Sequence, residues 1–206
     1  MADSPAFFSF DGIDGVGKST QLSLFCDWLR ESGRDVVVCR DPGSTPLGER
    51  LRSLVLKHDD ALPIGPRSEM LLYMAARAQL VDEIIRPALV AGKTVVSDRF
   101  LLANVVYQGH AGGLPVDDVR TVGAIAIAGV APACTFLLDM EPAAALARIG
   151  RELDRMESRG DSFRARLRAG FLAEAGYIGG TVHVIDAARS IEAVQSEIQR
   201  IAAGAL

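Results

Sequence analysis

Residues 12–20 read GIDGVGKST, and this stretch decides which fold the chain adopts. The apolar run AFFSF at residues 6–10 precedes it and predicts a buried strand, whereas Leu22, Phe25 and Leu29 follow it at helical spacing. Glycines between a strand and a helix let backbone N–H groups turn toward an anion, and the start of the helix adds its dipole. The stretch therefore predicts a loop that binds phosphate.

The spacing of this loop, GxxxxGK[ST], is the P-loop pattern. Lys18 is expected to bridge the β- and γ-phosphates of a nucleotide, and Ser19 is expected to ligate Mg²⁺. A glycine-rich turn without a ligand is the plain alternative, and the strand before the loop and the helix after it argue against that alternative. The pattern alone does not distinguish a kinase from a GTPase or a motor protein.

Composition limits the classes of partner. The chain has 206 residues, of which 49% are hydrophobic and 23% are charged, and its net charge is −4. These values favour one globular domain over residues 1–206, and they exclude a broad basic surface for nucleic acid. The uncharged stretch 121–138 contains Pro132 and two glycines, so it predicts a helix and a strand and no membrane span.

The cysteines and the N-terminus favour a cytoplasmic protein. Cys26, Cys39 and Cys134 are far apart in sequence and form no CxxC motif, which is typical of reduced thiols and of neither a zinc site nor a disulfide framework. The opening MADSPAFFSFDG contains an acid and no basic segment, so it does not predict a signal peptide.

Strand and helix patterns alternate from one end of the chain to the other. Apolar runs predict strands within residues 6–12, 35–43, 93–100, 133–140 and 181–187, and helical periodicity predicts helices within 18–31, 46–57, 68–92, 117–129, 142–153, 163–175 and 190–201. Nearly continuous apolar strands are typical of a parallel sheet that helices cover on both faces. We therefore expect an α/β fold of the three-layer αβα P-loop NTPase type, with a five-stranded parallel sheet.

Asp98 and Arg99 follow the third predicted strand. Asp98 is placed where an acid can help to hold Mg²⁺ through water, and Arg99 is placed where a guanidinium can grip a phosphate. A helix-capping acid and a surface arginine are the plain alternatives. The guanine-specifying sequence NKxD occurs nowhere in the chain, which counts against a GTPase.

With these residues in place, the chain resembles the thymidylate kinase family over nearly its whole length. Six segments carry the resemblance, in the same order as in the family: GIDGVGKST, RDPGST, LLYMAARAQL, DRF, NVVYQG and ELDRMES. The last strand and helix, TVHVIDA and SIEAV, are also similar. The resemblance implies ATP-dependent phosphorylation of dTMP to dTDP, a step of dTTP biosynthesis, with Mg²⁺ as cofactor.

The resemblance also implies roles for individual residues. Tyr73 would stack on thymine and Arg77 would donate to a thymine carbonyl, and their spacing of four residues places both on one helix face. Asp14 would accept a hydrogen bond from the 3′-hydroxyl of the deoxyribose. The implied ATP-binding residues are Gly12, Ile13, Asp14, Gly15, Val16, Gly17, Lys18, Ser19 and Thr20. The implied dTMP-binding residues are Asp14, Asp41, Tyr73, Arg77, Arg99, Asn104, Tyr107 and Gln108.

A short mobile lid near residues 148–160 would complete the site. Arg148, Arg151 and Arg155 are its candidate arginines, with Arg155 as the catalytic one beside Lys18, Arg99 and Asp14. Four positions depart from the family: Tyr73 replaces a usual Phe, Ala103 a Ser or Thr, Ala133 a common acid, and Gly15 the P-loop arginine of some members. The charge-rich lid segment has a plain alternative, a solvated helix end.

Two other functions compete with this interpretation. One is a P-loop kinase for another nucleotide or nucleoside, although adenylate and guanylate kinases tend to have Pro or Ser in the position of Asp14. The other is a protein that binds a nucleotide without turnover. The resemblance further implies a homodimer, in which the apolar helix near residues 121–130 forms either an interface or internal core.

Overall fold

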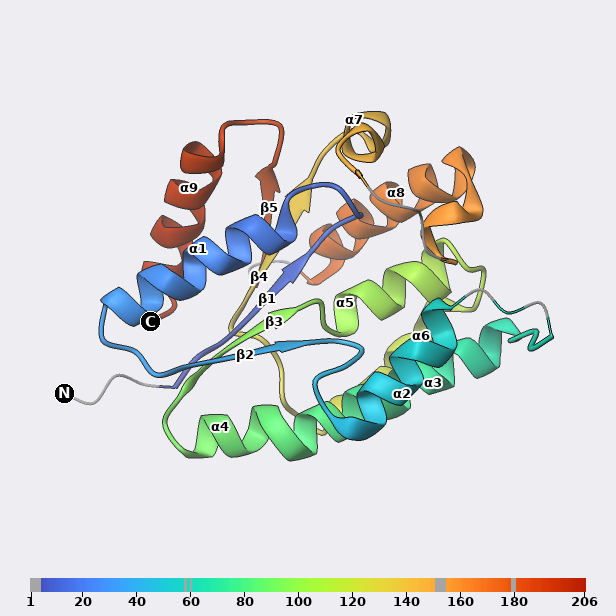
Figure 1. The fold of residues 1–206 in the computed structure, drawn as a ribbon, viewed down its shortest axis with the longest axis horizontal. Helices are drawn as coiled ribbons and strands as arrows, with labels where there is room; N and C mark the ends of the chain where they lie inside the picture. The colour runs from blue at the N-terminus through green and yellow to red at the C-terminus, as the bar shows by residue number, and fades with distance from the viewer. Residues whose placement is uncertain (1–4, 58, 60, 151–154, 179–180) are drawn as a thin grey trace.

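A computed structural model describes residues 5–57, 59, 61–150, 155–178 and 181–206, without the side chains of Glu157 and Ile178 (Figure 1). Its centre is a five-stranded parallel sheet with the strand order β2-β3-β1-β4-β5. The strands are β1 (Phe7–Asp11), β2 (Val36–Arg40), β3 (Thr94–Asp98), β4 (Cys134–Asp139) and β5 (Val182–Asp186). The predicted fold class and sheet are confirmed.

The burial of each strand follows its place in the sheet. The central strands β1, β3 and β4 are almost entirely buried, because helices cover both of their faces. The edge strands β2 and β5 are partly exposed, and Val38 and Val184 remain accessible at 45% and 46%. Continuous apolar sequence therefore marks a strand of this sheet without showing which strands lie at its edges.

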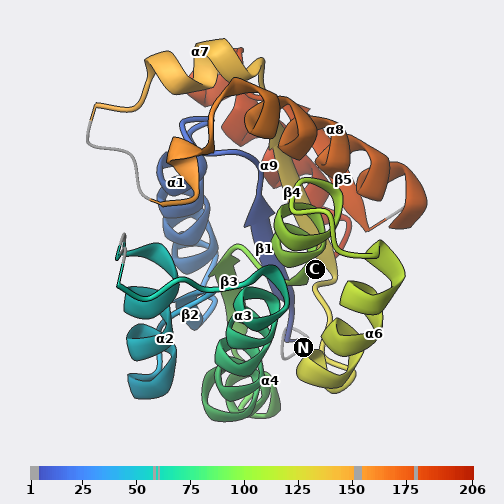
Figure 2. The same ribbon diagram turned by 90° about the vertical axis from the view of Figure 1, so that its right-hand side faces the viewer.

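Helices form a layer on each face of the sheet (Figures 1 and 2). α1 and α9 cover one face, where Phe25 packs against Phe8, Phe10 and Phe136. The continuous α3–η1–α4 segment and α8 cover the other face, while α2 and α6 flank α3. The bounds are α1 (Lys18–Glu31), α2 (Pro46–Leu56), α3 (Pro66–Leu80), η1 (Val81–Ile85), α4 (Arg86–Val90), α5 (Leu101–Asn104), η2 (Val105–His110), α6 (Val116–Ile127), α7 (Pro142–Ala147), η3 (Glu157–Arg159), α8 (Asp161–Ile178) and α9 (Ile191–Ala203).

The ends of β1 and β3 create the place for a ligand. The loop after β1 enters α1 on one face of the sheet, and the segment after β3 enters α5 on the opposite face. Phe10 of β1 is paired with Asp98 of β3, so both connections begin at the same sheet edge. Diverging connections at the carboxyl ends of parallel strands open a crevice, which is the usual ligand position in this class of fold.

The helix predicted over residues 142–153 is shorter than expected. α7 ends at Ala147, because Arg148 and Ile149 donate to carbonyls three residues back and tighten the last turn before Gly150. Residues 151–153 lie outside the described part of the chain. α8 extends beyond the predicted 163–175 at both ends. Within the described residues, none of the helices combines the length and apolar character that a membrane crossing requires.

Candidate active site

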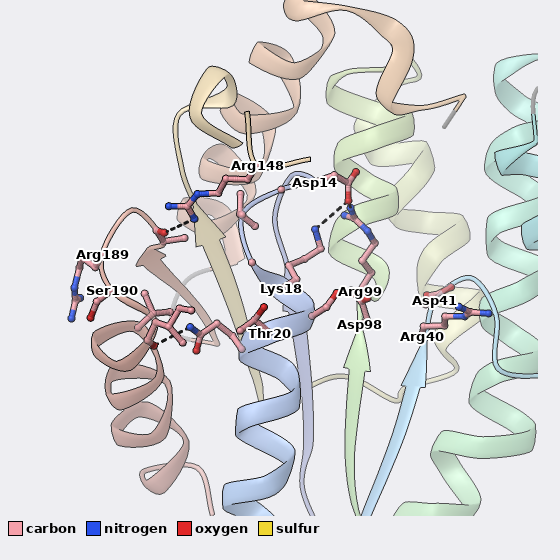
Figure 3. Close-up of a pocket in the computed structure, with 18 of the residues that line it drawn as sticks. Asp14, Lys18, Thr20, Arg40, Asp41, Asp98, Arg99, Arg148, Arg189 and Ser190 are labelled. Atoms are coloured by element: carbon pink, nitrogen blue, oxygen red, sulfur yellow. Dashed lines mark hydrogen bonds and ion pairs between the residues drawn. The ribbon is translucent and has the colours of Figure 1, made fainter. Parts of the chain in front are cut away.

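The P-loop borders a cavity of about 750 Å³ at the carboxyl edge of the sheet (Figure 3). Residues 14–20 of the loop line it, together with Asp98 and Arg99 from the end of β3. Gly12, Gly15 and Gly17 all have positive φ angles, which gives the loop a course that side-chain-bearing residues rarely follow. Lys18 folds back over the loop, and its Nζ atom donates to the carbonyls of Gly12 and Ile13 at 3.1 and 2.8 Å.

Asp14 is the centre of a cluster of charges at the mouth of this loop. Its Oδ1 atom accepts from Arg99 at 2.6 Å and from Lys18 at 3.3 Å, and its Oδ2 atom accepts from the Tyr107 hydroxyl at 3.2 Å. Burial acts to raise the pKa of Asp14, but the charges of Arg99 and Lys18 outweigh burial and hold that pKa well below its usual range. The acid in the phosphate loop is therefore an anion that fixes two cations.

The backbone of Arg99 adopts a left-handed conformation with φ 69°. The Arg99 N–H donates to the Phe10 carbonyl at 2.9 Å, and the Ser97 hydroxyl donates to the Arg99 carbonyl at 2.6 Å. These two bonds hold a conformation that costs free energy in a residue other than glycine. As a result, the guanidinium points toward Asp14 in the loop after β1 and also donates to the Gly12 carbonyl at 3.0 Å.

Asp98 has the properties expected of an acid beside a hydrated metal ion. Its Oδ1 atom is buried, and no described residue donates a hydrogen bond to it, which is unusual for a buried carboxylate oxygen. Ser19 lines the same cavity. The described residues contain no group of three or more His, Cys, Asp and Glu side chains placed as a metal cage. This sparse oxygen donor set fits Mg²⁺, which keeps most of its water and relies on substrate phosphates.

The wall near β5 and α9 supplies further residues of the large cavity. Arg148, Ala187, Arg189, Ser190 and Ile191 line it. Figure 3 shows Arg189 and Ser190 on the side away from Asp14, with Arg148 between them and the loop. Arg148 donates to the Ala187 carbonyl at 3.3 Å, which joins the end of α7 to the loop after β5. Sequence reasoning treated Ser190 only as a helix cap, and Ser190 does accept from the Ala193 N–H. Because the wall joins two distant segments, no local pattern marks it.

A second cavity of about 120 Å³ adjoins the first. Asp14, Asp41, Arg52 and Arg99 line both cavities, so these four residues form their common boundary. The remaining lining residues come from α2, α3, α5, η2 and the two loops that precede α2 and η3: Pro42, Leu56, Tyr73, Arg77, Ala103, Asn104, Tyr107, Gln108 and Met156. The structure thus brings together every dTMP-binding residue that the sequence nominated.

Arg77 is more deeply embedded than a surface-facing base donor would be. It is 2% exposed, and its Nε atom pairs with the equally buried Asp41 at 2.5 Å. Its Nη1 atom donates to Asn104 at 2.8 Å, and its Nη2 atom donates to the Phe100 carbonyl at 3.3 Å. Arg77 therefore both lines the smaller cavity and holds neighbouring residues of its wall in place.

Arg155, which was expected to reach the P-loop, contacts α2 and α3 in this structure. Its guanidinium pairs with Glu69 of α3 and donates to the Val55 carbonyl of α2 at 2.7 Å. Arg155 is absent from the residues that line the large cavity, among those that the structure describes. Arg151 lies outside the described residues. Of the two nominated lid arginines that the structure describes, Arg148 lines the P-loop cavity and Arg155 does not.

Comparison with known proteins decides the family. Residues 10–198 match the family model described as thymidylate kinase. A thymidylate kinase from Rhodopirellula baltica is 46% identical over 193 residues, covering 94% of this chain and 78% of that protein. One from Bifidobacterium longum is 45% identical over 195 residues, covering 94% and 95%. The crystal structure of the enzyme from Ehrlichia chaffeensis superposes with a TM-score of 0.79 at 29% identity, covering 97% and 99%.

The chain belongs to the thymidylate kinase family. The resemblance inferred from the six ordered segments is therefore confirmed. Sequence reasoning within that family missed Arg52 and Glu69. Arg52 lines both cavities and donates to the Pro42 carbonyl at 3.0 Å, but it stands in α2 among other charged residues. Glu69 had a detectable signal, because it lies four residues before Tyr73 and eight before Arg77, on the same helix face.

The structure explains why Gly15 takes the place of the P-loop arginine found in some thymidylate kinases. A Cβ atom on Gly15 would lie 2.0 Å from the Ala145 carbonyl oxygen of α7, and φ at Gly15 is +87°. Both the backbone conformation and the contact with α7 therefore exclude a side chain. In this chain, an arginine for the transferred phosphoryl group must come from outside residue 15.

We expect Gly15→Ala to weaken binding of ATP by about tenfold or more, because relief of a backbone clash must displace the loop that holds the phosphates. Isothermal titration with ATP measures this change. Gly65→Ala is the matched control, since φ at Gly65 is −71° and no atom lies within 4 Å of an added Cβ. Equal ATP affinity of the two variants would contradict the steric explanation.

Proposed function

We propose that this chain transfers the γ-phosphoryl group of ATP to the phosphate of dTMP, giving dTDP and ADP, in the cytoplasm and with Mg²⁺. The observation that carries this proposal is the shared boundary of the two cavities at Asp14 and Arg99. The large cavity suits the triphosphate of a donor nucleotide. The smaller one offers an aromatic ring and amide side chains, which suit a planar base and its polar edge.

Phosphoryl transfer between two nucleotides requires positioning and charge neutralisation more than a protein nucleophile. The backbone N–H groups of residues 14–20 and the ammonium of Lys18 bind the donor phosphates. Ser19, and Asp98 through water, would hold Mg²⁺, which supplies charge neutralisation at the β- and γ-phosphates when bound. Arg99 holds the acceptor phosphate against repulsion from the donor.

The acceptor phosphate needs no strong general base, because its oxygen is already an anion near neutral pH. The oxygen attacks the γ-phosphorus, a new P–O bond forms, and the bond from the γ-phosphorus to the β,γ-bridging oxygen breaks, releasing ADP. Asp14 keeps Arg99 oriented and accepts from the 3′-hydroxyl of the acceptor sugar. Arg155 leaves Glu69 and moves onto the transferring group. Closure of this segment over the site excludes water, which limits ATP hydrolysis.

A coupled assay of ADP release tests the proposed function. ATP and Mg²⁺ are supplied with dTMP, dUMP, dCMP, AMP or GMP, and dTMP is expected to give the highest kcat/KM. Highest activity with a purine monophosphate would instead indicate a different nucleotide kinase. Affinity for dTMP without ADP production would indicate a protein that binds nucleotides without turnover.

We expect Asp14→Asn to lower kcat/KM for dTMP by about 10², because the neutral amide loses the ion pair with Arg99 and the acceptor for the sugar hydroxyl. The Kd of ATP should change far less. Tyr107→Phe, which removes only the hydroxyl that donates to Asp14, is a milder control. A collapse of ATP affinity in Asp14→Asn would assign the acid to the donor side of the site.

For Arg155→Ala we expect kcat to fall by about 10² or more while the Kd of dTMP changes only slightly, because the arginine stabilises charge that develops during transfer. Steady-state kinetics and equilibrium titration separate the two quantities. Arg30→Ala, which removes an exposed arginine of α1, controls for the change of charge. A large loss of dTMP affinity at nearly normal kcat would make Arg155 a binding residue.

The proposed enzyme is a homodimer that uses the outer face of α3 and α6. These helices pack side by side (Figure 2). Leu71 and Ile125 on them are 53% and 76% exposed. The sequence left open whether the second helix forms interface or core, and its buried Val119, Gly123 and Ala126 show that one face is core. An outer apolar face on a globular chain favours a partner.

Light scattering is expected to give about twice the chain mass of 21.9 kDa. Ile125→Glu should shift the protein toward the monomer, since it would place charge in the proposed interface. Val90→Glu is the control, because Val90 is 84% exposed on α4 and lies outside that face. Monomeric wild-type protein at micromolar concentration would contradict the proposed dimer.

A further inference from the structure

Glu69 is a buried acid directly behind the wall of the smaller cavity. It lies on α3 and is 4% exposed, and it is not one of the residues that line the cavity. Its Oε1 atom accepts from Gln108 Nε2 at 3.0 Å, and its other oxygen accepts from Arg155. Burial of a carboxylate costs free energy unless it is paired and hydrogen-bonded, and here both oxygens have such partners. One of these partners, Gln108, lines the cavity.

Glu69 ends a chain of hydrogen bonds whose direction is fixed. Arg77 Nη1 donates to Asn104 Oδ1 at 2.8 Å, and Asn104 Nδ2 donates to Gln108 Oε1 at 2.5 Å. Gln108 Nε2 then donates to Glu69. One end of the chain is a guanidinium, which only donates, and the other is a carboxylate, which only accepts. Both amides between them therefore have one permitted orientation.

This constraint removes an ambiguity that amide side chains normally have. An isolated Asn or Gln turns by half a rotation and exchanges its donor for its acceptor at little cost. Here the exchange would set the Asn104 NH₂ group against Arg77 and the Gln108 carbonyl oxygen against Glu69. Each contact would place like partial charges together in a buried site, where an unpaired polar group is expensive.

A fixed orientation matters because Asn104 and Gln108 both line the cavity that would receive the base. Thymine presents a 4-oxo acceptor beside an N3–H donor. Cytosine presents the reverse, a 4-amino donor beside an unprotonated N3 acceptor. Amides that turn freely can satisfy either edge, whereas amides held in one orientation match only one of the two edges. Polar groups left unmatched by the wrong base are the stronger route to discrimination.

We propose that Glu69 is a specificity-determining positioning residue, which holds the Gln108 and Asn104 amides in one orientation and thereby selects a 4-oxo over a 4-amino pyrimidine monophosphate. This inference rests on the proposed function, because it assigns a pyrimidine nucleotide to the smaller cavity. Glu69 acts through the two amides and has no contact with the base of its own.

The Glu69→Gln variant tests the role, since it keeps the shape of the side chain and adds an N–H donor where only an acceptor stood. The ratio of kcat/KM for dTMP to that for dCMP should fall by about tenfold or more. Glu69→Asp, which keeps an acceptor-only group, should retain more of this preference. Glu31→Gln, a change of the same charge at an exposed position of α1, should leave the ratio unaltered.

The ratio of the two kcat/KM values separates the positioning role of Glu69 from its ion pair with Arg155. Loss of the Arg155 pair affects transfer to both acceptors alike, so it lowers both rates and cancels in the ratio. An equal fall for dTMP and dCMP in Glu69→Gln, or no fall at all, overturns the proposal. A wild-type enzyme without preference for dTMP contradicts the proposed function instead, so the two failures are distinguishable.

A measurement on the wild-type protein keeps the proposal testable if Glu69→Gln does not fold. In ¹⁵N NMR spectra of the protein without nucleotide, the side-chain NH₂ groups of Asn104 and Gln108 should exchange hydrogen with water much more slowly than exposed amides do. Slow exchange is expected because both groups are bonded within a buried chain. Exchange as fast as that of exposed amides would show that the amides turn freely, and would overturn the proposal.

Discussion

The ion pair between Asp14 and Arg99 joins the two halves of the site. Asp14 stands in the loop after β1, and Arg99 stands just after β3, so the pair spans the crevice that the sheet topology opens. Without the carboxylate, Lys18 and Arg99 would be two cations near one loop with no fixed separation. The left-handed backbone of Arg99 has the same function, because it turns the guanidinium toward the loop.

From that pair, the site extends in two directions that the fold keeps separate. Apart from Arg40, Asp98 and the four residues shared by both cavities, donor-side residues come from the P-loop and the start of α1, from Arg148 after α7 and from the segment that runs from β5 into α9, at β1 and on its β4–β5 side. Acceptor-side residues come from α2, α3, α5 and η2, on the other side. Arg77 and Asp41 form a buried ion pair within the acceptor wall. Burial of such a pair favours a fixed arrangement more than it favours stability.

Much of the fold and about half of the site were accessible from sequence. Residues 12–20 could be recognised as a phosphate-binding loop because the pattern is local. The helix that follows begins at Lys18, as the apolar periodicity predicted. Tyr73 and Arg77 were nominated by the resemblance of LLYMAARAQL to a family segment, and their helical spacing then placed both on one face. Arg52, Glu69 and the segment at Arg189 were missed, since their roles depend on which helices and loops meet in space. The end of α7 at Ala147 was missed for a local reason instead, because a tightened last turn outweighed helical periodicity.

The close approach of Gly15 to α7 has an evolutionary consequence. A single substitution to arginine at that position is barred, because the Ala145 carbonyl already occupies the space of the first side-chain atom. A lineage that carries an arginine in this loop must also have shifted α7 or remodelled the loop backbone. A change at residue 15 alone is therefore expected to weaken binding of the phosphates, so it separates the two arrangements by an unfavourable step. Replacement of glycine by arginine in this loop requires coordinated changes at residue 15 and at Ala145 of α7, which lie 130 residues apart in the sequence.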